Sequence, residues 1–169
     1  RYGSPMLRLA AELVATPLAA GAAASRALPL PDTPDQTVRA THISERGEWD
    51  YDLGIKRHPG FVIRPGWLAA ILAGHKKVRA GLSIDAPVLS MMSTLSTFGR
   101  TWTEAMMETD TVLDVKNLAK RSVLLGPHVT VLRVAGGLHD LTLSRADVRE
   151  KVMDDIAAWL EAWVVSRSV

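Results

Sequence analysis

The sequence predicts a protein of the α/β class, in which two parallel strands and their helices follow a mostly helical first half. Residues 86–93 form a compact apolar run, and residues 128–137 are rich in β-branched side chains; both runs are typical of buried strands. A helical period follows each run. Alternation of strand and helix implies parallel strands joined by right-handed crossovers. Two such strands alone do not make a stable sheet, and the sequence offers few candidates for neighbouring strands.

The first half of the chain is predicted to be helical and interrupted. Residues 5–27 are rich in Ala and Leu and predict a helix, whereas the three prolines of residues 28–34 predict a stiff extended connector. Residues 37–63 have no long helical period, which leaves short strands and irregular structure as equal alternatives. Residues 64–82 predict a helix, with Pro65 in its first turn.

Two helices are predicted in the second half. Residues 110–126 carry a helical apolar stripe that includes Val112 and Val115, and Gly126 is placed as a C-terminal stop. The last helix is expected to begin at a capping box formed by Ser144 and Asp147. Its apolar face consists of Val148, Val152, Ile156, Trp159 and Trp163.

The composition indicates one globular domain. The chain has 169 residues, of which 47% are hydrophobic, a net charge of +2 and no cysteine. The absence of cysteine excludes disulfides and thiolate metal sites, and it fits a reducing compartment, so we expect a cytoplasmic protein. Scattered Lys and Arg residues without a basic stripe argue against nucleic acid as a partner.

An apolar stretch near the start imitates a signal peptide. Residues 13–24 are apolar and end in small residues, but Glu12 abuts them and Pro17 interrupts them. The stretch is shorter than the roughly 20 residues that a membrane-spanning helix needs. We therefore expect a surface helix or cap helix there, and no transmembrane segment.

One histidine and one aspartate are the candidates for chemistry. His139 follows the second strand on a Gly-Gly turn, and Asp110 follows the first strand after a long loop. Because the carboxyl ends of neighbouring parallel strands share one sheet edge, the two side chains could meet there. Asp110 would then orient the imidazole, which could take a proton from a nucleophile.

Other interpretations of these residues stay open at this point. Asp110 could be a helix N-cap, and Asp114 is a rival acid one turn further along the chain. Asp140 could brace the turn or form hydrogen bonds with nearby amides. The remaining histidines, which are His42, His58, His75 and His128, show no metal-ligand spacing and are interpreted as surface or structural residues. We expect no metal and no cofactor.

The segments "PVLSMMS", "TDTVLDV" and "GGLHDL" resemble the C-terminal part of α/β-hydrolases, most closely the lysophospholipase or monoacylglycerol-lipase-like group, also described as serine aminopeptidase-like. The resemblance extends back through residues 47–82. It implies a cap region with a connecting helix at residues 1–82 and the C-terminal part of the hydrolase core at residues 83–169. It also implies that Asp110 is the acid and His139 the general base of a Ser-His-Asp triad.

The sequence departs from this family at the nucleophile. No G-x-S-x-G segment is present, so the resemblance implies the C-terminal portion of a serine hydrolase. Its serine is expected in an N-terminal segment of the same parent protein, which is cleaved, truncated or carried by a separate polypeptide. We expect this chain alone to be inactive and the parent to hydrolyse an ester or lipid-like small molecule. Trp49, Trp67 and Trp102 are candidates for the pocket walls, with ordinary packing as their alternative role. The alternative function is a non-catalytic α/β module that acts through association with a partner.

Overall fold

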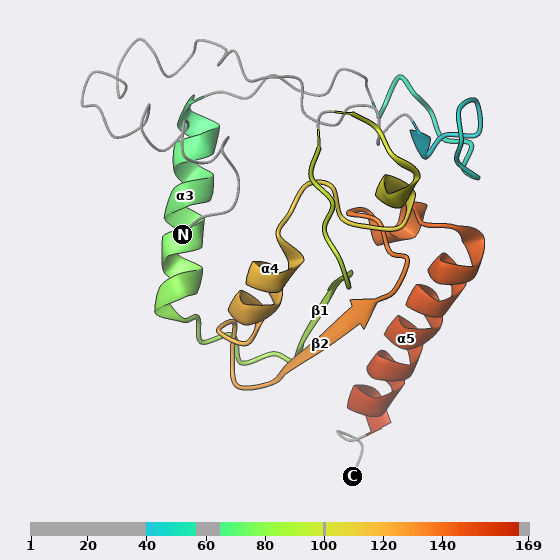
Figure 1. The fold of residues 1–169 in the computed structure, drawn as a ribbon. Coiled ribbons are helices and arrows are strands. Elements are labelled where there is room, and N and C mark those ends of the chain that lie inside the picture. The colour runs from blue at the N-terminus through green and yellow to red at the C-terminus, as the bar shows by residue number, and fades with distance from the viewer. Residues whose placement is uncertain (1–39, 57–64, 100, 166–169) are drawn as a thin grey trace.

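The structure is a computed structural model that describes residues 40–56, 65–99 and 101–165. The elements are α3 (Pro65–Ala80), β1 (Val88–Ser93), the 3-10 helix η3 (Glu104–Met107), α4 (Val115–Ser122), β2 (Val129–Val134), the 3-10 helix η4 (Leu141–Leu143) and α5 (Ala146–Val165). Figure 1 shows the two strands between α4 and α5, with α3 to one side. The α/β class is thereby confirmed. The helix expected at residues 5–27, the connector at 28–34 and His58 lie outside the described residues.

The two strands pair in parallel, as their connection through a helix predicts. The register runs from Val88 opposite Val129 to Ser93 opposite Val134. Both strands are shorter than the sequence predicted. Strand β1 begins directly after Pro87, which has no N–H to donate to the ladder, and β2 ends where the chain turns at Gly136.

Helix α5 covers one face of the sheet and forms the core with it. Val148 and Val152 of this helix are buried against Val134 of β2, and Met91 and Ile156 pack around them. The indole N–H of Trp159 donates to the hydroxyl of Thr130 at 2.9 Å. The predicted apolar face of α5 is therefore the face that packs on the strands. Complete burial of one such valine contributes about 1.5 to 3 kcal/mol.

Helix α4 is much shorter than the predicted span of residues 110–126. The carboxylate of Asp110 accepts hydrogen bonds from the amides of Val112 and Leu113, which holds these residues in a turn that competes with helix formation. Asp114 then caps the helix by accepting from the amide of Lys116 at 3.0 Å. The prediction that Val112 belongs to the buried stripe was wrong, since 53% of this residue is exposed.

Gly126 does not end the helix, although the sequence predicted it as the C-terminal stop. Helix α4 ends at Ser122, with Val123 as its C-cap, several residues before this glycine. A Cβ at Gly126 would lie 2.4 Å from the carbonyl oxygen of Ile84, so the position is kept small by a close backbone approach. The predicted glycine stop was therefore wrong, and Gly126 instead lets the chain after α4 pass beside the chain that leads into β1.

Helix α3 confirms the helix predicted at residues 64–82. Hydrogen bonds just beyond its C-terminus join it to the rest: the amide of Leu82 donates to the carbonyl of Leu124 at 2.7 Å. Leu68 is buried, whereas 55% of Trp67 is exposed. In the part of the chain that the structure describes, neither α3 nor any other helix has the length and apolar content to cross a membrane.

Residues 41–56 have no regular helix or strand, which is one of the two alternatives left by the sequence. Turns and an isolated bridge between His42 and Trp49 make up this segment. It lies against the beginning of α5, where Glu48 accepts a hydrogen bond from the amide of Ala146 at 2.7 Å. The predicted capping box at Ser144 was wrong. That hydroxyl points inward and accepts from the amide of Leu138, while the distant Glu48 binds the first amide of the helix.

Candidate active site

Asp110 lies just beyond the carboxyl end of β1. Its backbone pairs with the chain that leaves this strand: the amide of Asp110 donates to the carbonyl of Leu95, and the amide of Thr97 donates to the carbonyl of Asp110, both at 3.0 Å. The long loop predicted between the strand and the acid is present, but it returns to the strand end. The backbone therefore fixes the acid at this edge of the sheet.

The carboxylate of Asp110 is buried and fully engaged. Its side chain is 3% exposed. One oxygen, Oδ1, accepts hydrogen bonds from the amides of Val112 at 2.7 Å and Leu113 at 2.8 Å. These bonds leave the second oxygen, Oδ2, pointing to the loop after the neighbouring strand.

His139 reaches Asp110 from that loop. Gly136 has a φ of +72°, which is a conformation that a residue with a Cβ rarely adopts, and it turns the chain after β2. The Nδ1 atom of His139 lies 3.1 Å from Oδ2 of Asp110. An ionised carboxylate has no proton to donate, so Nδ1 carries the hydrogen and Nε2 has the lone pair. None of the described residues forms a hydrogen bond with Nε2, and the side chain of His139 is 44% exposed.

Each member of the pair stabilises the charged form of the other. Burial opposes ionisation of Asp110, but the hydrogen bonds from His139, Leu113 and Val112 outweigh it and lower the pKa of this carboxyl below its ordinary value of 3.8. The hydrogen bond to Asp110 raises the pKa of His139 above 6.5, against the effect of partial burial. The imidazolium form that would follow proton uptake is therefore favoured at this site.

Among the residues that the structure describes, the rival acid Asp114 and the histidines His42, His75 and His128 form no hydrogen bond with Asp110 or His139. Asp114 is the N-cap of α4, where it binds the amides of Lys116 and Asn117, so the structure pairs His139 with Asp110 instead. The interpretation of Asp110 as an N-cap was wrong. His42 is buried, and its Nδ1 accepts from the amide of Ser44 at 3.0 Å, which is a structural role. His75 and His128 lie at the surface.

Asp140 braces the histidine loop, as one interpretation of the sequence predicted. Its Oδ1 accepts a hydrogen bond from the hydroxyl of Thr142 at 2.7 Å, and its Oδ2 pairs with the ammonium of Lys56 at 3.0 Å. Burial disfavours the charged carboxylate, yet the bonds from Thr142 and Lys56 lower the pKa of Asp140 below 3.8. The negative charge of Asp140 raises the pKa of His139, and the positive charge of Lys56 lowers it.

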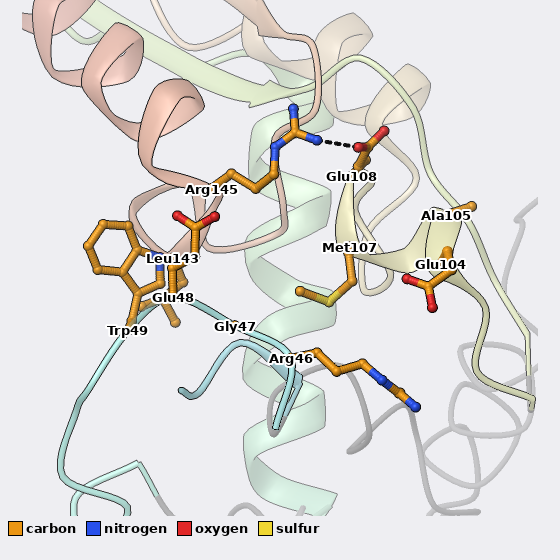
Figure 2. A pocket seen from close by; sticks show the side chains of 10 residues that line it. All are labelled: Arg46, Gly47, Glu48, Trp49, Glu104, Ala105, Met107, Glu108, Leu143 and Arg145. Atoms are coloured by element: carbon orange, nitrogen blue, oxygen red, sulfur yellow. Dashed lines mark hydrogen bonds and ion pairs between the residues drawn. The ribbon is translucent and has the colours of Figure 1, made fainter. Parts of the chain in front are cut away.

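A hollow of about 400 Å³ adjoins the histidine loop. Figure 2 shows Arg145 and Glu108 paired at its edge, with Trp49 and Leu143 together on another side. The volume is within the range of small-molecule pockets. Neither Asp110 nor His139 lines this hollow, so it is a neighbour of the pair and is separate from it.

Of the three tryptophans that the sequence offered as pocket walls, only Trp49 lines this hollow. Trp67 lies on α3. The ring of Trp102 packs beneath the guanidinium of Arg46, whose central carbon lies 3.8 Å from the ring centroid. Trp102 therefore has the ordinary packing role that was the alternative to a pocket wall.

Several polar groups near the pair were not found from the sequence. Ser144 is completely buried, and its hydroxyl accepts from the amide of Leu138, the residue before His139. Lys56 contacts Asp140, the residue after it. No sequence signal joined residues 40–56 to a loop that lies so much further along the chain.

Over residues 40–56, 65–99 and 101–165, no three His, Asp or Glu side chains gather in a way that could hold a metal ion. The chain matches no family model, no curated protein and no solved structure.

Proposed function

We propose that this chain is the C-terminal portion of a serine hydrolase of the α/β-hydrolase kind and supplies the acid and base of its Ser-His-Asp triad. The observation that carries the proposal is the 3.1 Å contact between Nδ1 of His139 and Oδ2 of Asp110, made beyond the carboxyl ends of two adjacent parallel strands. The nucleophilic serine belongs to a segment outside these 169 residues, since the sequence has no G-x-S-x-G motif.

His139 is the general base of the proposed reaction. Its Nε2 removes the proton of the serine hydroxyl as the serine oxygen attacks the carbonyl carbon of an ester. The same nitrogen then gives the proton to the leaving alcohol, which leaves an acyl-enzyme that water hydrolyses by the same two proton transfers. Asp110 stays ionised throughout, because it orients the ring and stabilises the imidazolium without taking the proton. The low pKa of Asp110 and the raised pKa of His139 support these roles.

The proposed substrate is a carboxylic ester with an apolar acyl group, such as a lysophospholipid-like molecule. Large apolar side chains are exposed in the two segments that meet at Asp110. Their exposed fractions are 58% for Leu95, 56% for Phe98, 53% for Val112 and 40% for Leu113. The isolated bridge between Ser96 and Asp110 joins the two segments, and we propose that these apolar side chains bind the acyl chain of the substrate.

The test uses p-nitrophenyl esters of different acyl length, with this chain and with a polypeptide extended upstream to include the serine segment. We expect no hydrolysis by the 169-residue chain and hydrolysis by the extended polypeptide. His139→Ala should reduce kcat by roughly six orders of magnitude in the extended polypeptide while the fold is kept. Asp114→Asn is the matched control, and it should leave kcat unchanged because Asp114 caps a helix.

An extended polypeptide that is folded, retains the Asp110–His139 hydrogen bond and hydrolyses no ester would overturn the proposal. If that polypeptide instead binds a protein partner through the exposed apolar residues around Asp110, the non-catalytic α/β module becomes the better description. A chromatographic complex that Phe98→Ser abolishes would identify that outcome.

A further inference from the structure

The loop that carries His139 is held by a segment far away in the sequence. The indole N–H of Trp49 donates to the carbonyl of Ser144 at 2.8 Å. The amide of Ala146 donates to Glu48 at 2.7 Å, and Lys56 pairs with Asp140 at 3.0 Å. Residues 40–56 therefore contact the histidine loop at both its beginning and its end.

Ser144 links the Trp49 contact directly to the histidine. The residue is completely buried, and its hydroxyl accepts from the amide of Leu138 at 3.0 Å. Leu138 is itself buried and immediately precedes His139. A continuous series of hydrogen bonds and peptide bonds thus runs from the indole of Trp49 through Ser144 and Leu138 to the imidazole.

The indole is itself held in place. The guanidinium carbon of Arg149 lies 3.8 Å from the centroid of the Trp49 ring, and Arg149 belongs to the first turns of α5. Figure 2 shows the ring of Trp49 beside Leu143 at the edge of the hollow. A stacked and packed ring donates its N–H in one fixed direction, so the carbonyl of Ser144 has a rigid partner.

We propose that Trp49 is a positioning residue for His139, because its indole N–H fixes Ser144 and thereby fixes the backbone that carries the imidazole toward Asp110. The catalytic meaning of this role rests on the proposed function. The positional claim does not, since it concerns only where the imidazole lies. Loss of the indole N–H leaves the carbonyl of Ser144 without its partner, and the loop then samples positions in which Nδ1 of His139 no longer meets the carboxylate.

The experiment compares Trp49→Phe with Trp159→Phe in the full 169-residue chain. Both variants lose one indole hydrogen bond, and the bond of Trp159 joins α5 to Thr130 of β2 at 2.9 Å, outside the histidine loop. Titration of His139 is followed by nuclear magnetic resonance of the ring nitrogens. Trp49→Phe should lower the pKa of His139 by on the order of half a unit, which is a roughly threefold loss of proton affinity. Trp159→Phe should leave it unchanged.

The result that overturns the inference is an unchanged His139 titration in Trp49→Phe, or an equal shift in both variants, since an equal shift would indicate general loosening. If Trp49→Phe fails to fold, benzothienylalanine at position 49 replaces it. This analogue keeps the ring shape, has sulfur in place of the N–H, and must give the same shift.

A second measurement separates this inference from the proposed function. In the extended polypeptide that contains the serine, Trp49→Phe should lower kcat for p-nitrophenyl esters with little change in KM, because the substrate does not contact Trp49 in this role. A shifted titration without any ester hydrolysis would retain Trp49 as a positioning residue and reject the hydrolase. Ester hydrolysis with an unshifted His139 titration would retain the hydrolase and reject Trp49 as a positioning residue.

Discussion

The two halves of the Asp110–His139 pair are built in different ways. The carboxylate of Asp110 is held by the amides of Val112 and Leu113, which are two and three residues further along the chain. The loop of His139 is held by Trp49 and Glu48 across 95 and 98 residues. The carboxylate is therefore oriented by its own turn, and its backbone is held by Leu95 and Thr97 within 15 residues, whereas the histidine loop is held by a distant segment.

This difference predicts which half is easier to disturb. A local turn forms with little loss of chain entropy beyond that of its own residues, whereas a contact across nearly a hundred residues exists only once the whole domain has folded. Changes in residues 40–56 should therefore move the histidine and leave the acid in place. Changes near the acid should alter both stability and the histidine titration.

The largest effect is expected at the acid itself. Asp110→Ala removes the acceptor for the amides of Val112 and Leu113 and the partner of His139, and it should lower the free energy of unfolding by about 2 to 3 kcal/mol. The pKa of His139 should fall, because its main raising interaction is lost. Chemical denaturation and resonance titration measure the two effects.

Asp110→Asn separates those two effects. The amide oxygen of asparagine can still accept from the two backbone amides, so most of the stability should return. The negative charge is absent, so the pKa of His139 should remain below its wild-type value, as in Asp110→Ala. A pKa of His139 in Asp110→Ala that stays as high as in the wild type would contradict the assignment of Asp110 as the partner.

A smaller loss of stability is expected at Asp114, the helix cap that the sequence also offered as the catalytic acid. Asp114→Ala removes the side chain that binds the amides of Lys116 and Asn117, and it should lower the free energy of unfolding by about 1 kcal/mol. The titration of His139 should be unchanged. A shift comparable to that of Asp110→Ala would show that the two aspartates are not separated in the way the structure places them.

The pair should also contribute to stability in a limited pH window. The folded-state pKa of Asp110 lies below 3.8, so its contribution is complete above this pH and is lost as the pH falls through the folded value. The folded-state pKa of His139 lies above 6.5, so its contribution is complete below this pH and is lost as the pH rises through the folded value. The difference in unfolding free energy between wild type and His139→Gln should therefore be greatest between pH 3.8 and 6.5.

The size of this difference should be below about 1 kcal/mol, because the exposure of His139 screens the interaction. Denaturation of both proteins at several pH values measures it. A difference that does not vary with pH would mean that the hydrogen bond is not between charged groups.

The smallest effect is expected at the ion pair beside the histidine. Lys56→Met removes a positive charge that lowers the pKa of His139, so this pKa should rise, while the free energy of unfolding should change by less than about 0.5 kcal/mol. Lys151→Met is the matched control, since Lys151 pairs with Asp155 on the exposed side of α5. An equal titration shift in both variants would indicate a general effect of net charge.

The sequence predicted the elements of the second half because their signals are local. The apolar runs at the two strands, the period of α5 and the turn at Gly136 each depend on residues that are neighbours in the chain. The pairing of Asp110 with His139 was one of several alternatives. The choice between Asp110 and Asp114 needed the position of each carboxylate relative to the sheet edge, which a spacing along the chain does not contain.

The errors in the prediction come from contacts that residue propensities leave out. Helix α4 begins late because a carboxylate competes for its first amides, Gly126 is set by a backbone that passes beside it, and α5 is capped by Glu48 instead of by Ser144. Residue propensities describe what each segment prefers alone. They do not include the competing side chain two and three residues away that delays α4, nor the backbone and the carboxylate from elsewhere in the fold that act on Gly126 and on α5.

The amino-acid sequence by itself determined the α/β class, the order of strand and helix, and the small set of residues from which an acid and a base could come. Hydrophobic period and turn chemistry act over a few residues, which is why these features can be read without coordinates. The tertiary structure alone decided that Asp110 meets His139 and that Trp49 holds the histidine loop. These contacts join residues 29 and 95 positions apart, and only the pairing of the strands and the packing around α5 bring such residues together.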